Sequence, residues 1–228
     1  MKEFYPRIDI LPAAQKRLWP ELSQVPDEFV LYGGTALALH LGHRASIDFD
    51  FFSGRPLNLA ELQAGIAFLT NSKVIQREKN TLSVIVERGE PIKVSFFGVP
   101  KLPKLMPPHI IRENNLKIAS LLDLAGTKLS VIQMRAEAKD YFDVDAMIRL
   151  GEISLPTALA AAQMLYGPTF NPELSLKALS FFDDGNLREL PDDLKERLVV
   201  ASRNVDLDEL PDIEGNPRPI DYDNGLEL

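Results

Sequence analysis

The amino-acid sequence predicts an α+β protein, because the patterns typical of strands and those typical of helices occupy different halves of the chain. Before about residue 100, short runs rich in β-branched and aromatic residues alternate in polarity or end at glycines. From about residue 117 onward, apolar residues recur at helical spacing, and Gly, Pro and Asp separate the periodic segments. Strands followed by helices, rather than strands alternating with helices, are characteristic of the α+β class.

Four segments of the first half are predicted to form strands, namely Phe29–Tyr32, Ile47–Phe52, Thr81–Val86 and Ile92–Phe97. The first is a short apolar run that stops at two glycines, and the second alternates apolar and acidic residues. The last two are separated by a turn that contains Gly89-Glu90-Pro91, which predicts a hairpin.

Helical spacing is found in segments 11–22, 35–41, 57–70, 117–135, 140–150, 154–166, 172–182 and 192–203. Thr35 is predicted to cap the second of these helices, and Gly42 to end it. The proline-rich stretch 100–110 predicts an extended connection. We therefore expect an α/β core over residues 1–110, a helical part packed on that core over 111–205, and a flexible acidic tail over 206–228.

Composition excludes several classes of protein. The chain of 228 residues has no cysteine, which excludes disulfides, thiolate zinc sites and cysteine nucleophiles, and it has only three histidines. No run approaches the roughly 18 apolar residues of a membrane span, and the first residues do not resemble a signal peptide, so a cytoplasmic protein without a membrane partner is expected. The net charge of −8 is concentrated in residues 206–228, which carry eight acids and one base. This distribution argues against a broad nucleic-acid surface but leaves room for a local basic pocket.

One stretch of the first half has the pattern of a phosphate and metal site. Gly33 and Gly34 lie between a predicted strand and a predicted helix, where the backbone approaches a ligand closely and the helix start favours an anion. Asp48 and Asp50 are two apart on a predicted strand, so both carboxylates lie on one face. Two carboxylates near a phosphate cradle suit a magnesium–nucleotide complex, whereas each piece alone is as often a tight turn or a solvated face.

A family resemblance is carried by four segments: 31–39 (LYGGTALAL), 43–52 (HRASIDFDFF), 123–129 (DLAGTKL), and Arg135 with 139–143 (KDYFD). The first two resemble the nucleotidyltransferase superfamily with the DNA polymerase β-like fold. All four in this order resemble, more closely, the AbiEii/AbiGii toxin family. The resemblance implies a polymerase β-like nucleotidyltransferase core, which is a mixed sheet with flanking helices, followed by a helical C-terminal part.

The resemblance also implies the reaction and its partners. It implies the toxin component of a toxin–antitoxin system, which transfers a nucleotidyl group from a nucleoside triphosphate to a tRNA or protein acceptor and has a cognate antitoxin. Mg²⁺ or Mn²⁺ would be bound by Asp48 and Asp50, which are expected to be catalytic, and Gly33, Gly34 and Thr35 would hold phosphates. Arg44 precedes the metal strand and is expected to contact the nucleotide, or else to pair with the carboxylates.

In the second half, the resemblance assigns catalytic roles to Lys128 and Asp140, and nucleotide binding to Lys128, Arg135 and Lys139. Lys128 and Arg135 are seven apart, which predicts that they share one face of a single helix and together grip a triphosphate. Two structural alternatives stay open: a solvated helix face for the cations, and helix capping for Asp140 and Asp143.

The chain departs from the family pattern at one position. Polymerase-like transferases carry a third carboxylate on the strand after Asp-x-Asp, and Ser95 stands in the corresponding place, with Lys93 on the same face. A single metal ion is then sufficient, or Asp140 or Asp143 contributes, or catalysis is weakened. The alternatives to an active transferase are a nucleotide- or partner-binding module on the same fold and an interaction protein whose Asp-x-Asp strand is only structural.

Overall fold

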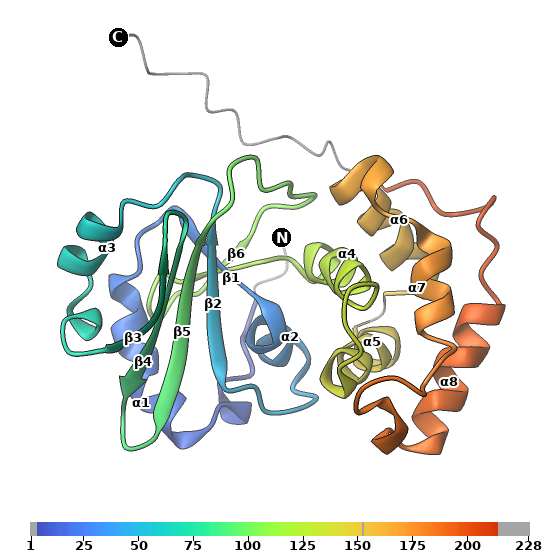
Figure 1. The fold of residues 1–228 in the computed structure, drawn as a ribbon, viewed down its shortest axis with the longest axis horizontal. Coiled ribbons are helices and arrows are strands. Elements are labelled where there is room, and N and C mark those ends of the chain that lie inside the picture. Colours follow the sequence, from blue (N-terminus) through green and yellow to red (C-terminus); the bar gives the residue numbers. More distant parts are fainter. Residues whose placement is uncertain (1–3, 152, 214–228) are drawn as a thin grey trace, which may run out of the picture. The chain divides into compact units, whose positions relative to one another are not determined.

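A computed structural model describes residues 4–151 and 153–213, so residues 214–228 of the predicted acidic tail lie outside the described residues. The chain forms two compact units (Figure 1). Of the described residues, the N-terminal unit contains 4–103 together with 107–120, and the helical unit contains 104–106, 121–151 and 153–213. The predicted α+β class is confirmed, because every strand found in the described residues belongs to the N-terminal unit and the sheet is mixed.

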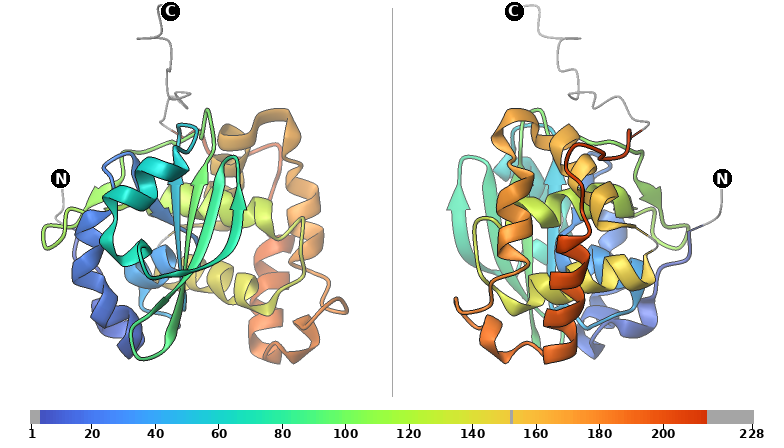
Figure 2. Two further views of the ribbon diagram at one scale, coloured as in Figure 1. Left: turned by 60° about the vertical axis from the view of Figure 1, so that its left-hand side comes forward. Right: turned by 90° about the vertical axis from the view of Figure 1, so that its right-hand side faces the viewer.

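The N-terminal unit is built on a seven-stranded sheet in the order β3-β4-β5-β2-β1-β7-β6. β2 pairs antiparallel with β1 and parallel with β5, while β4 and β5 form the predicted hairpin, which is prominent in Figure 1 and in the left view of Figure 2. The strand bounds are β1 Phe29–Tyr32, β2 Asp48–Ser53, β3 Lys73–Glu78, β4 Thr81–Glu87, β5 Pro91–Gly98, β6 His109–Ile110 and β7 Lys117–Ile118.

The two faces of this sheet differ in character. In register across four strands, Leu82, Phe96, Phe51 and Leu31 are all completely buried and form the core face. The rings of Phe51 and Phe96 stack with centroids 5.3 Å apart. The adjacent row across the same four strands lies on the opposite face and carries polar groups, namely Ser83, Ser95, Asp50 and Tyr32. The alternation of apolar and polar residues in β2 thus places its acidic residues on the face away from the core.

Helices of the N-terminal unit pack against this sheet, with α2 next to β1 and β2 and α1 next to β5. Their buried faces contribute Leu18, Leu37 and Leu39 to the core, and Trp19, directly after α1, is buried as well. The helical bounds are α1 Ala13–Leu18, α2 Gly33–Leu41 and α3 Leu59–Gly65, with short 3₁₀ turns η1 Ile8–Ile10, η2 Trp19–Gln24 and η3 Ala67–Leu69.

The helical unit has its own apolar core. Gly126 of α4 lies so close to α6 that an added Cβ would be 2.9 Å from the backbone nitrogen of Ala162, which explains a glycine inside a helix. The bounds are α4 Leu121–Val131, α5 Ala138–Leu150, α6 Leu155–Tyr166, α7 Pro172–Ala178 and α8 Asp192–Arg203, with 3₁₀ turns η4 Gly167–Thr169 and η5 Leu187–Glu189. None of the helices in the described part of the chain has the length and apolar character to cross a bilayer.

Several predicted elements are corrected. The helix predicted over 117–135 is wrong at both ends, since residues 117–118 form β7 beside β1, and α4 ends at Val131. Thr35 does not cap α2, which begins at Gly33 with Tyr32 at the N-cap. The predicted helix 57–70 is shorter and continues as a 3₁₀ turn. β3 was not predicted because all six of its residues are exposed, so its sequence has no apolar alternation.

Candidate active site

The two carboxylates of β2 lie on the polar face of the sheet. Asp48 and Asp50 are half-buried, whereas Phe49 and Phe51 between and after them are completely buried on the core face. Because β2 is an interior strand, its backbone is fixed from both sides by β1 and β5. The strand therefore holds two anionic groups in a defined position with partial access to solvent.

Gly33 approaches Asp50 of this carboxylate pair from the start of α2, which lies beside β2 (Figure 1). Its φ is +74°, and an added Cβ would be 2.9 Å from Oδ2 of Asp50. Both the backbone conformation and the close approach thus require glycine at this position. The sequence prediction that this glycine and the Asp-x-Asp strand come together is confirmed by this geometry.

Thr35 is buried, and its hydroxyl donates a hydrogen bond to the backbone carbonyl of Asp48. This contact ties the first turn of α2 to the beginning of β2. The structure thus gives Thr35 a positioning role for β2, while its predicted phosphate contact stays a prediction.

The side chain of Arg44 lies over Gly34. A Cβ added to Gly34 would be 2.7 Å from a terminal guanidinium nitrogen of Arg44 and 3.1 Å from Oγ of Ser46. Another guanidinium nitrogen donates to the carbonyl of Ala45 at 3.0 Å. A fixed positive charge is thus present where the backbone of α2 begins, which suits an anionic ligand.

Ser95 occupies the position next to Asp50 on the neighbouring strand β5, which confirms the strand pairing inferred from sequence. It is completely buried and accepts a hydrogen bond of 3.1 Å from Ser83. Within residues 4–151 and 153–213, no group of three or more acidic or histidine side chains is arranged to hold a metal ion. The β2 pair nevertheless fits a hard divalent cation, because both groups are oxygen ligands on one face of the strand and Gly33 places no side chain of its own against Asp50.

The helical unit contains a separate, buried cluster of charges. Nζ of Lys128 lies 2.8 Å from a carboxylate oxygen of Asp140 and 2.8 Å from one of Asp143. Both carboxylates are completely inaccessible to solvent, and Lys128 is buried as well. The alternative that these residues form a solvated face or a helix cap is therefore wrong for Lys128, Asp140 and Asp143; the N-cap of α5 is Glu137.

Arg135 lies beyond the end of α4, so the prediction that it shares a helix with Lys128 is wrong. It nevertheless reaches the same cluster, because its Nε donates to Asp140 at 2.8 Å and a terminal nitrogen donates at 3.2 Å. Burial alone would raise the pKa of Asp140, but the hydrogen bonds from Arg135 and the charge of Lys128 outweigh it, so this pKa lies below the ordinary value. Lys139 points elsewhere: it is half exposed and pairs with Glu137 at 2.7 Å.

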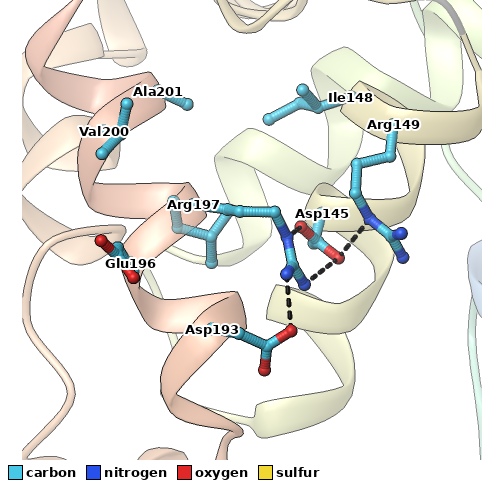
Figure 3. A pocket seen from close by; sticks show the side chains of 9 residues that line it. Asp145, Ile148, Arg149, Asp193, Glu196, Arg197, Val200 and Ala201 are labelled. Atoms are coloured by element: carbon cyan, nitrogen blue, oxygen red, sulfur yellow. Dashed lines mark hydrogen bonds and ion pairs between the residues drawn. The ribbon is translucent and has the colours of Figure 1, made fainter.

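A pocket of about 530 Å³ lies between α5 and α8 of the helical unit (Figure 3). On its wall the nearly buried carboxylate of Asp145 accepts hydrogen bonds from Arg149 and Arg197, and Arg197 also pairs with Asp193. The remaining lining residues are Ile148, Glu196, Leu198, Val200 and Ala201. Sequence reasoning missed this cluster: the i,i+4 spacing of Asp145 and Arg149 is a weak signal, and Arg197 is 52 residues away.

Several solved structures are similar to this chain, including the following two. One is a candidate nucleotidyltransferase from H. pylori, with a TM-score of 0.51 and 19% identity, covering 83% of this chain and 92% of that chain. The other is MenT4, a nucleotidyltransferase toxin from Mycobacterium tuberculosis H37Rv, with a TM-score of 0.58 and 16% identity, covering 86% and 83%. At these identities the likeness establishes the fold, and it confirms the predicted nucleotidyltransferase core with its helical C-terminal part.

Sequence comparison extends the likeness to a relative and to a family. An uncharacterized protein of Aquifex aeolicus (strain VF5), aq_aa25, is 29% identical over 160 residues, which is 69% of this chain and 75% of that protein. The model of the nucleotidyl transferase AbiEii toxin family, from type IV toxin–antitoxin systems, matches residues 17–214. That span contains both the β2 carboxylates with Gly33 and the buried cluster around Lys128. The chain therefore belongs to the AbiEii nucleotidyltransferase toxin family.

Proposed function

We propose that this protein uses Mg²⁺ or Mn²⁺ to transfer a nucleotidyl group from a nucleoside triphosphate to a hydroxyl group of an RNA or protein acceptor. The observation that carries the proposal is the position of Asp48 and Asp50 on the polar face of β2, with Asp50 directly against Gly33 at the start of α2. A phosphate-binding helix start and two oxygen ligands for a divalent ion are thereby held within one rigid unit.

Each residue of this site has a distinct task in the proposed reaction. Gly33 and Gly34 present backbone N–H groups of the α2 terminus to phosphate oxygens, and Arg44 adds a guanidinium at the same place. Asp48 and Asp50 hold the divalent ion, which when bound neutralises charge on the phosphates. Thr35 keeps the beginning of β2 in place through its hydrogen bond to the Asp48 carbonyl.

The chemical step is an in-line displacement at the α-phosphorus. A bond forms between the acceptor oxygen and the α-phosphorus, the bond from that phosphorus to the bridging oxygen of the β-phosphate breaks, and pyrophosphate leaves. The acceptor proton passes to a carboxylate or to water. The chain's contribution is mainly positioning and electrostatic stabilisation, since phosphoryl chemistry requires little else from a protein.

The helical-unit residues belong to the same proposal. Catalytic roles for Lys128 and Asp140, and nucleotide contacts for Lys128, Arg135 and Lys139, are supported by the family's motif and by the convergence of two cations on Asp140. The guanidinium of Arg135 is half-exposed, so part of its surface can be reached by a phosphate, although it pairs with Asp140 and lies 3.5 Å from a carboxylate oxygen of Glu137. A cognate antitoxin is likewise proposed from the family.

The proposal is tested by incubating the protein with each of the four α-³²P-labelled triphosphates, Mg²⁺ or Mn²⁺, and either total RNA or total protein. We expect label transfer that EDTA prevents and that Asp48→Asn and Asp50→Asn each reduce by at least about a hundredfold. Transfer that survives both substitutions would refute the site. Metal-dependent triphosphate binding without any transfer would instead identify a binding module on the same fold.

A further inference from the structure

Lys93 lies beside the carboxylate pair, on the strand next to β2. β5 runs parallel to β2, and the register places Lys93 opposite Asp48 and Ser95 opposite Asp50. Residues paired in register point to the same side of a sheet, and neighbouring strands are about 4.8 Å apart. The lysine stem therefore rises from the same polar face, directly next to the proposed metal ligands.

This lysine differs from the buried one in the helical unit. Lys128 is neutralised by two carboxylates at 2.8 Å. Within the described residues, the ammonium group of Lys93 has neither an ion pair within 4.0 Å nor a hydrogen bond, and the residue is half-buried. A positive charge that is partly withdrawn from water and has no protein partner is available for an anionic ligand.

Charge balance favours such a ligand. Two carboxylates match the charge of one divalent ion, whereas two divalent ions in one site require further anionic ligands. The position in register with Asp50 is filled by Ser95, a neutral hydroxyl that accepts a hydrogen bond from Ser83. A site with three carboxylates and two divalent ions has a net charge of about +1. A site with two carboxylates, one divalent ion, one lysine and a neutral hydroxyl has the same net charge.

We propose that Lys93 binds the phosphate chain of the nucleotide directly and supplies the fixed positive charge beside a single divalent ion. The inference rests on the proposed function, since it assumes that a triphosphate occupies the polar face of β2. It assigns the site one metal ion per bound nucleotide. Because the charge of Lys93 belongs to the chain itself, it is in place before any metal ion binds. The protein should therefore have some affinity for a triphosphate without metal.

The test uses the full chain and a non-hydrolysable α,β-methylene nucleoside triphosphate, so that binding is measured without turnover. By isothermal titration, Lys93→Met should weaken binding of the triphosphate analogue at least about tenfold, both with Mg²⁺ and in EDTA. Binding of the monophosphate should change much less, and Lys93→Arg should restore most of the affinity. An unchanged affinity in Lys93→Met would overturn the assignment.

Lys73 provides a matched control. It belongs to the same row of the sheet, because Lys73 pairs with Ile85 and Ile85 pairs with Lys93, which places it about 10 Å from Lys93. Lys73→Met removes the same charge from the same face and should leave triphosphate affinity unchanged. An equal loss of triphosphate affinity in both variants would mean that Lys93 acts only through the overall positive charge of this face, and it would overturn direct binding.

Metal stoichiometry is the second readout. Titration of Mn²⁺ followed by electron paramagnetic resonance, with saturating analogue, should give one bound ion per wild-type chain; two ions would overturn the inference. Failure of the proposed function is separately recognisable. If Asp48→Asn abolishes binding of the analogue while Lys93→Met does not, only the role of Lys93 is wrong, whereas no binding by the wild type would refute both.

Discussion

Gly33 and Gly34, the first two residues of α2, have different surroundings, so replacing each of them by alanine should have different effects. Gly33→Ala forces a side chain into a left-handed conformation and against Asp50, so it should destabilise the protein by about 1–3 kcal/mol. In Gly34→Ala the added methyl group meets only side-chain atoms, the flexible end of Arg44 and Oγ of Ser46, which can move. This substitution should therefore change stability by less than about 1 kcal/mol while weakening nucleotide binding. Thermal unfolding and nucleotide titration of the two variants would test this contrast. Similar unfolding temperatures for both would contradict it.

The buried carboxylate of Asp140 should make stability depend on pH. Its pKa is below the ordinary value in the folded protein, so the ionised group stabilises the fold at neutral pH and this contribution is lost as pH falls below about 4. At pH 7, Asp140→Asn should cost about 3 kcal/mol, because Lys128 and Arg135 lose a shared partner. Denaturant titrations of both proteins between pH 7 and pH 3 should show the difference shrinking toward acid. A difference that is constant with pH would contradict the ionic role.

His40 should also make stability fall toward acid, but for a different reason: it is a buried neutral group, whereas Asp140 is a buried ionised one. Its Nε2 lies 2.9 Å from the carbonyl of Ala119, which can only accept, so the neutral ring donates from Nε2. Burial lowers its pKa to about 4, helped by the nearby His109 and opposed by the hydrogen bond. Between about pH 6.5 and 4 the unfolded chain binds a proton that the folded protein does not, so stability falls as pH decreases, by up to about 3 kcal/mol.

The measurement compares wild type with His40→Gln, whose amide reaches the same carbonyl without titrating. The variant should lose less stability between pH 7 and pH 4.5. His109→Gln is the control. His109 is less buried than His40, and burial lowers its pKa less than it lowers the pKa of His40. Identical pH profiles for wild type and His40→Gln would exclude His40 as the source.

At the scale of elements, the packing of α4 on α6 depends on a missing side chain. In Gly126→Ala the added methyl group would lie 2.9–3.0 Å from backbone atoms of Ala162 and Ala161, which cannot rotate away, so about 2 kcal/mol or more of stability should be lost. Gly65→Ala is the control, because this helical glycine has open space around its Cβ position. It should stabilise its unit by up to about 1 kcal/mol. Chemical denaturation of both variants would test these opposite signs.

Elements could be predicted where a sequence pattern matched a burial pattern. β2 is fully buried on one face and half-buried on the other, and its alternation is visible in the sequence. β3 is exposed throughout, and β7 has only two residues, so neither leaves a periodic trace. β7 is a strand only because this part of the chain pairs with β1, where the backbone N–H of Ala119 donates to the carbonyl of Leu31. That is a tertiary contact, which periodicity does not encode.

The candidate site shows the same limit. Gly33 and Asp50 belong to one strand–helix–strand segment, so their meeting could be predicted from local order. Arg135 and Asp140 are only five residues apart in the motif, so their contact is local. The prediction that Arg135 lies on the same helix as Lys128 is wrong, because α4 ends at Val131. The pair Asp145 and Arg197 spans 52 residues with no motif, and only the packing of α5 on α8 brings it together.

At the scale of the whole molecule, a three-residue segment of the N-terminal half belongs to the helical unit. The backbone N–H groups of Leu105 and Met106 donate to the two carboxylate oxygens of Asp123 at 2.7 and 3.2 Å, and Leu105 packs against Leu165. Asp123→Ala removes both acceptors and should release this segment.

Limited trypsin digestion checks this prediction, because exposed lysines stand at positions 101 and 104. Cleavage after Lys104 should be several-fold faster in Asp123→Ala than in wild type, with helical content unchanged by circular dichroism. Asp183→Ala, at an exposed carboxylate elsewhere in the helical unit, is the control and should digest like wild type. Equal cleavage rates would mean that the apolar contact of Leu105 alone holds the segment.

The position of β7 has a consequence for how the chain is made. β1 is synthesised early, but its second neighbour in the sheet is residues 117–118, which leave the ribosome almost ninety residues later. Until then one side of β1 offers unpaired backbone groups, a template on which another nascent chain can add a strand. The N-terminal unit is therefore complete only once residue 120 has emerged, and any shorter product of interrupted translation carries an open sheet that is prone to association.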